Sequence, residues 1–163
     1  IDYIGVCEGP GSFTGIRVGI ATAYGLTLGN DINLLGFSQF EVYRFLLKDS
    51  GKMIIPIIDA KKNKFYCAFI KESDNTIEMF DLTKEQILQK APSDAIFVGR
   101  DTLLLKNDYP DINVAYEEGY TSKELTLFLD DLINNGDNFR YPKPIYLRKS
   151  EAEITLLSKR REL

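Results

Sequence analysis

The sequence contains no histidine and only two cysteines, Cys7 and Cys67. Histidine is both the commonest metal ligand and the commonest general base, so its absence removes two kinds of site at once. A zinc site, a Ser-His-Asp triad or a Cys-His pair cannot be built from this chain alone. Both cysteines lie in apolar, strand-like runs, where free buried thiols are expected rather than a disulfide.

The chain also lacks a long apolar run and an excess of positive charge. No apolar run approaches the ~18 residues that a membrane-spanning helix needs, and no signal peptide is evident. The 163 residues include 20 Lys and Arg against 24 Asp and Glu, which gives a net charge of −4. A protein that holds RNA by itself usually has a basic face, so this balance argues against that role. We expect a cytoplasmic protein with one domain or two small ones.

A glycine-rich stretch, Glu8–Gly15, separates an expected strand at 1–8 from an expected helix at 14–29. A strand, turn and helix in this order can present backbone N–H groups to an anion. The stretch matches neither the P-loop nor the dinucleotide fingerprint, because Gly9 and Gly15 are separated by five residues and Thr14 replaces the third glycine. Two interpretations stay open: a tight turn packed on the sheet, or a phosphate contact through Gly9, Gly11, Ser12, Thr14 and Arg17.

The helix at 14–29 carries small residues every four positions, at Gly15, Gly19 and Ala23. Such a stripe lets another helix or a sheet approach closely, and the protein's own sheet is one candidate. A partner is the other, because Ala21, Gly25 and Leu28 leave the remaining surface apolar as well. The candidate interface residues are Gly15, Ile16, Gly19, Ile20 and Ala23.

The remaining pattern predicts alternating strands and helices. Turn residues and apolar runs predict strands at 32–37, 53–58, 64–71, 76–82, 95–98 and 112–115, with helices from Ser38, from Thr83 to Lys90, after Asp101, and from Ser122 to Asn135. The three strands within 53–82 are expected to form an antiparallel meander. Residues 137–144 are expected to be a polar loop, and 145–147 a short extended piece.

The order of these elements suggests an internal duplication. Residues 1–50 are expected to form a strand, a helix, a strand and a helix. The last four of the eight elements expected in residues 52–136 follow the same order. We therefore expect an α/β fold of mixed sheets flanked by helices, with an incomplete first half at 1–50, a second domain at 51–147 and a tail at 148–163.

Three stretches resemble the bacterial TsaB (YeaZ) family in the right order: Gly9–Ala23, Pro56–Tyr66 and Pro142–Arg148. The resemblance implies two ribonuclease H-like halves of the actin–Hsp70–sugar kinase type. It also implies that the opening meander and helix of the first half are missing. Because the first residue is Ile1 rather than Met, we expect an N-terminally truncated protein or a fragment.

The resemblance further implies a non-catalytic subunit in the making of threonylcarbamoyladenosine in tRNA. The expected partners are a TsaD-type transferase and a TsaE-type ATPase, or a second copy in their absence, with tRNA reached only through the complex. No metal or cofactor is expected. The alternative is an actin-like kinase or ATPase domain that binds ATP through the Gly9–Gly15 turn.

Actin-like ATPases hold phosphates between glycine-rich turns of their two halves, and the turn of the second half would here be Asp59–Asn63. This turn contains no glycine, and bulky side chains hinder the approach of the backbone to a phosphate. Asp59 is therefore expected to cap the turn, and Lys61 and Lys62 to be solvated, with a nucleotide or RNA contact as the alternative. Glu8, at a strand end before the glycine turn, is expected to accept a structural hydrogen bond, with a catalytic role as the alternative. Arg17 has three open candidates: the turn, a carboxylate or a partner.

Overall fold

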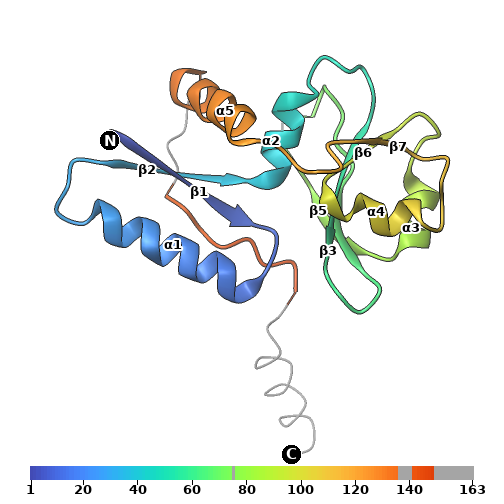
Figure 1. The fold of residues 1–163 in the computed structure, drawn as a ribbon, viewed down its shortest axis with the longest axis horizontal. Helices are drawn as coiled ribbons and strands as arrows, with labels where there is room; N and C mark the ends of the chain where they lie inside the picture. The colour runs from blue at the N-terminus through green and yellow to red at the C-terminus, as the bar shows by residue number, and fades with distance from the viewer. Residues whose placement is uncertain (75, 136–140, 149–163) are drawn as a thin grey trace, which may run out of the picture.

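The computed structural model describes residues 1–74, 76–135 and 141–148, and its ribbon is shown in Figure 1. The expected tail therefore lies outside the described residues from 149 onward, as does the loop at 136–140. The elements in chain order are β1 (Tyr3–Gly9), α1 (Phe13–Thr27), β2 (Asn33–Ser38), α2 (Gln39–Leu46), β3 (Ile54–Asp59), β4 (Phe65–Ala68), β5 (Met79–Leu82), α3 (Lys84–Lys90), β6 (Ile96–Val98), η1 (Arg100–Thr102), α4 (Leu103–Lys106), β7 (Asn113–Ala115) and α5 (Ser122–Asn135).

The first unit is a strand, helix and strand in which β1 and β2 pair in parallel. Parallel strands need a crossover connection, and α1 supplies it. The helix buries Ile16, Ile20 and Ala23, which recur at helical spacing, against the strands. This face of α1 belongs to the core of the chain itself.

The second unit is a mixed sheet with the strand order β5-β4-β3-β6-β7. The expected meander is confirmed, because β3 pairs antiparallel with β4 and β4 antiparallel with β5. Strand β3 then pairs in parallel with β6, and β6 in parallel with β7. The centre of β3 is buried, with Ile55 and Ile57 at 0% and 1% exposure, as its continuous apolar run predicts.

Helix α5 covers the small sheet on the face away from α1, and this contact joins the two units. The ring of Phe128 on α5 lies 5.5 Å from the ring of Phe37 on β2. At Gly5 of β1 an added Cβ would lie 2.8 Å from Cδ2 of Leu129, so α5 packs closely on the strand at this position. The structure confirms α5 over the expected range Ser122–Asn135, and Thr121, just before it, exchanges capping hydrogen bonds with Glu124.

None of the helices within the described residues is both long and apolar enough to cross a membrane. The α/β order expected from the pattern is present throughout, with boundaries that move by a few residues. The two units meet where the C-terminal segment passes between them, and the candidate site lies there.

Candidate functional site

The glycine-rich turn between β1 and α1 is a tightly packed bend. Gly9 has φ of 111°, a conformation that favours glycine. A Cβ at Gly9 would lie 2.7 Å from Cδ1 of Ile16 and 3.3 Å from the carbonyl oxygen of Ile145. The hydroxyl of Ser12 accepts a hydrogen bond from the Gly15 N–H at 3.3 Å and so caps α1, as its residue type predicts.

Residues 141–148, here called the C-terminal strap, run across this turn (Figure 1). The backbone N–H of Ile145 donates to the carbonyl oxygen of Glu8 at 2.8 Å. The Glu8 side chain, only 3% exposed, accepts the backbone N–H of Lys143 at 2.7 Å through Oε1. The expectation of a structural hydrogen bond at Glu8 is confirmed, and its carboxylate anchors the strap.

An aromatic and cationic cluster closes the turn from outside. The ring of Tyr146 stacks on that of Phe13 with 4.4 Å between centroids. Arg17 donates from Nε to the Tyr146 hydroxyl at 2.8 Å, and its guanidinium lies 4.1 Å from the Phe13 centroid. Such stacking stabilises a cation by about 0.5–2 kcal/mol. Of the three contacts considered for Arg17, the structure shows the one with the turn, through Phe13, and adds a contact with the strap, through Tyr146.

The candidate anion-contact residues are thus only partly available to a ligand. Ser12 caps the helix, Arg17 is stacked, and Gly9 is packed against Ile16. Thr14 is exposed, and a Cβ at Gly11 would meet no atom within 4 Å, so open space remains beside these two. A phosphate contact here stays a prediction, which calorimetry with ATP and magnesium can test.

The second turn, Asp59–Asn63, follows β3. Asp59 accepts the Lys61 backbone N–H at 2.7 Å and pairs with its Nζ at 2.5 Å, so the expected capping role is confirmed. This hydrogen bonding lowers the pKa of Asp59. Three consecutive residues, Lys61, Lys62 and Asn63, have φ between 55° and 61°. This is the left-handed region, in which the backbone of residues other than glycine is strained.

Arg148 fastens the far end of the C-terminal strap to this second turn. Its guanidinium donates to both carboxylate oxygens of Asp81, at 2.5 and 2.6 Å, and to the carbonyl oxygen of Ala60 at 2.6 Å. The strap therefore holds the Gly9 turn through Glu8 and Tyr146, and the Asp59 turn through Arg148. Two loops that are distant in sequence become neighbours through eight residues of chain.

The predicted interface residues on α1 divide into two groups. Ile16, Ile20 and Ala23 are only 5–8% exposed and pack within the chain, and Gly19 lies over Val6 of β1. Gly15 is exposed. The side of α1 that faces outward carries Val18 and Leu26, which are 59% and 57% exposed, and Leu28 directly after the helix is 76% exposed. The role of all of these positions in an interface stays a prediction.

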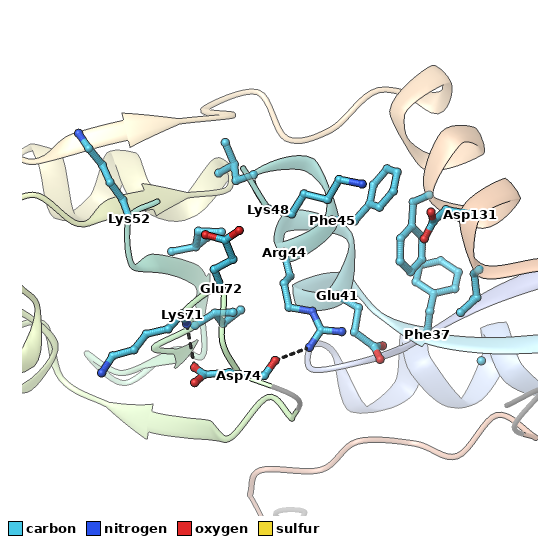
Figure 2. A pocket seen from close by; sticks show the side chains of 16 residues that line it. Phe37, Glu41, Arg44, Phe45, Lys48, Lys52, Lys71, Glu72, Asp74 and Asp131 are labelled. Atoms are coloured by element: carbon cyan, nitrogen blue, oxygen red, sulfur yellow. Dashed lines mark hydrogen bonds between the residues drawn. The ribbon is translucent and has the colours of Figure 1, made fainter. Parts of the chain in front are cut away.

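A cavity with a volume of about 570 Å³ lies away from both turns, between α2, α5 and the segment after β4. Figure 2 shows its lining, which includes four basic and four acidic side chains: Arg44, Lys48, Lys52, Lys71, Glu41, Glu72, Asp74 and Asp131. Arg44 donates to the Asp74 carbonyl oxygen at 3.3 Å, and Asp74 accepts the Lys71 N–H.

The clear pKa shifts of cysteines and tyrosines within residues 1–135 are all upward. Burial raises the pKa of Cys67, Tyr43 and Tyr120 to about 12, and it also raises the pKa of Cys7. A thiol with a raised pKa is a poor nucleophile because little of it is thiolate. No group of three metal-ligating side chains occurs among the described residues.

Comparison with known proteins supplies the family context. Residues 1–156 match the family model described as TsaD, tRNA N6-adenosine threonylcarbamoyltransferase. The chain is 27% identical over 119 residues to the tRNA threonylcarbamoyladenosine biosynthesis protein TsaB of Bacillus subtilis, a match that covers 69% of this chain and 52% of the relative. With TsaB of Escherichia coli it shares 33% identity over 79 residues, 47% of this chain and 34% of the relative. The matches thus span about half of these relatives or less.

Two solved structures from Pseudomonas aeruginosa share the fold. One, described as an uncharacterized protein with similarity to peptidase YEAZ, superposes with a TM-score of 0.64 at 17% identity and covers 91% of this chain and 74% of its own. The other, YeaZ, gives 0.63 at 18% identity, covering 90% and 74%. With the mixed sheets described above, these similarities confirm the expected ribonuclease H-like, actin-type α/β class.

Proposed function

We propose a function from the premise that this chain belongs to the TsaD family and is a TsaB (YeaZ)-type member of it. The proposed role is in the biosynthesis of threonylcarbamoyladenosine in tRNA. In this role the chain is a non-catalytic subunit that binds and stabilises a TsaD-type transferase. A TsaE-type ATPase and the tRNA join through the complex, and a second copy takes the partner's place when the transferase is absent.

The observation that carries the proposal is the outward side of α1. Val18 and Leu26 on α1, and Leu28 directly after its last residue, are large apolar side chains that are more than half exposed. Between them lie Ala21 and Gly25, which are also exposed and leave the surface low enough for close helix packing. Apolar side chains gathered on one exposed face are typical of protein–protein interaction sites.

The ionisation of the site supports a structural rather than a chemical role. The described groups with a clear pKa shift move away from neutrality: tyrosines and cysteines upward, and Asp59, Glu85 and Glu124 downward. General acids and bases need the opposite, a pKa near the working pH. The buried carboxylate beside the glycine turn, Glu8, is used to hold the C-terminal strap.

We also propose that residues 1–50 and 51–147 are two related ribonuclease H-like units. The order β1, α1, β2, α2 is repeated by β6, η1 with α4, β7 and α5. Both copies pair their two strands in parallel around a helical crossover. Partner binding through α1 would then use the helix that the second unit replaces with the much shorter η1 and α4.

The test is binding of the purified chain to the TsaD-type transferase of the same organism, measured by calorimetry. Val18→Asp and Leu26→Asp place a charge on the outward side of α1 without touching the buried Ile16, Ile20 and Ala23. Each should weaken binding by about tenfold or more, since burying an unpaired charge at an interface costs about 1–3 kcal/mol.

Leu127→Asp on α5 is the matched control, because Leu127 is 52% exposed on another helix and should leave binding unchanged. Circular dichroism confirms that each variant is folded. The interface would be wrongly placed if all three variants bound like the parent chain. The proposed subunit role itself would fail if the parent chain showed no binding.

A further inference from the structure

Another cavity, with a volume of about 440 Å³, lies between the end of α3 and the loop that joins α4 to β7. Sites for small molecules usually have volumes of about 300–1,000 Å³ and mostly apolar walls. Ala95 and Phe97, which are 1% and 3% exposed, line this cavity together with the half-buried Leu88, Ala91 and Ile112. All five belong to the core of the larger sheet or pack against it, so the cavity is an apolar groove on that core.

The charged side chains of this groove are of one sign. Asp108 and Asp111 line it, and no lysine or arginine does so among the described residues. The ammonium group of Lys84 contacts Asp108 through Oδ2, and the Asp108 side chain is 56% exposed. Asp111 is exposed, and its carboxylate has no hydrogen-bond or ion-pair partner within residues 1–74, 76–135 and 141–148. The groove therefore offers carboxylate oxygens that can accept further hydrogen bonds.

Three further residues of the lining favour a positively charged ligand over a negatively charged one. Pro92 and Pro110 have no backbone N–H to donate to an anion. The half-buried Tyr109 adds an aromatic ring, and the face of such a ring attracts a cation. An anion in the groove would instead be repelled by the two carboxylates.

We propose that this groove binds a small organic ammonium ion, a primary amine carried on an apolar body. The apolar body lies against Leu88, Ala91 and Phe97, and the ammonium group donates to the carboxylates of Asp111 and Asp108. Hydrogen bonds between two charged groups are about twice as strong as neutral ones, so the amine supplies the specificity. The groove lies in the second unit, at the opposite end of the molecule from α1 (Figure 1), and this binding is separate from the proposed subunit role.

Three probes that share one apolar body test the proposal: 2-phenylethylamine, 2-phenylethanol and 3-phenylpropionate. Each is titrated into the full chain, and backbone amide signals are followed by NMR. The amine should shift the signals of Ala91, Ala95 and Ile112 in a saturable way. Its affinity should exceed that of the alcohol about tenfold, since a hydrogen bond to a charged group is stronger than a neutral one. The carboxylate should cause no saturable change at these residues.

Asp111→Asn keeps the size of the side chain and removes its charge. It should lower the affinity for the amine roughly threefold or more and leave that for the alcohol unchanged. Asp130→Asn is the matched control, because Asp130 is an exposed carboxylate on α5, away from the groove, and its loss should leave both affinities unchanged. Both positions are exposed, so both variants should fold like the parent chain, which circular dichroism verifies.

The proposal would be overturned if the amine caused no saturable shifts at these residues, bound no more tightly than the alcohol, or bound Asp111→Asn as tightly as the parent chain. Tighter binding of the acetylated and amidated dipeptide Phe-Lys than of the amine would also overturn it, because the occupant would then be a side chain of another polypeptide. The titrations need no transferase, so their result is independent of the proposed partner of α1.

Discussion

The guanidinium of Arg148 is the contact through which the C-terminal strap holds the second sheet, and replacing it by alanine is the sharpest test of the strap. Arg148→Ala removes both hydrogen bonds to Asp81 and the one to the Ala60 carbonyl oxygen. Asp81, whose side chain is 18% exposed, then keeps the more distant Lys64, whose Nζ lies 3.9 Å from its carboxylate.

The size of the effect lies between two limits. Breaking a fully buried ion pair costs about 3–5 kcal/mol, and an exposed pair contributes about 0.2–1 kcal/mol. The Arg148 and Asp81 side chains are 26% and 18% exposed and their contact is bidentate. We therefore expect the free energy of unfolding to fall by about 2 kcal/mol, which for a chain of this size lowers Tm by about 4–8 °C.

Thermal and urea denaturation measure this change directly. Lys106→Ala is the matched control, because it removes an ion pair to Glu117 whose side chains are 42% and 37% exposed. We expect it to cost no more than about 0.5 kcal/mol. Arg148→Lys should resemble Arg148→Ala, since an ammonium group cannot reproduce the two-pronged contact. The reasoning would be refuted if Arg148→Ala and Lys106→Ala lowered stability equally.

Two further predictions concern stability. Ser38→Ala removes the capping box of α2, in which Ser38 and Glu41 exchange hydrogen bonds at 3.2 and 2.5 Å. The free energy of unfolding, measured by urea denaturation, should fall by about 1–2 kcal/mol. An unchanged midpoint would contradict this. Raising the pH should destabilise the fold from about pH 9 to about 12. In the unfolded chain Cys67 loses its proton near the ordinary pKa of 9.0, and Tyr43 and Tyr120 lose theirs near 10.0. In the folded chain burial raises the pKa of all three groups to about 12, so between these values the unfolded chain releases protons that the folded chain keeps. Melting temperatures across that range would show it, and a flat profile would contradict it.

The local features of the fold could be predicted from the sequence because they depend on neighbouring residues. The apolar run of β3, the lysine turn after it and the capping residues Ser38 and Thr83 each determine a strand, a turn or a helix start by short-range chemistry. The range expected for α5, from Ser122 to Asn135, likewise agrees with the structure.

The candidate site could be predicted only in part, because its contacts join distant positions. Lys143 and Glu8 are 135 residues apart, and Tyr146 and Arg17 are 129 apart. The family resemblance marked both segments but gave no contact between them. The small residues of α1 had two possible partners, and only the structure shows that Ala23 faces the protein's own core.

The central claim is that the outward side of α1 binds a TsaD-type transferase, and calorimetric titration of the folded Val18→Asp chain against that transferase tests it most directly. The account predicts saturable binding by the parent chain and by Leu127→Asp, with affinity reduced about tenfold or more for Val18→Asp. Equal affinity of the parent chain and Val18→Asp would contradict it.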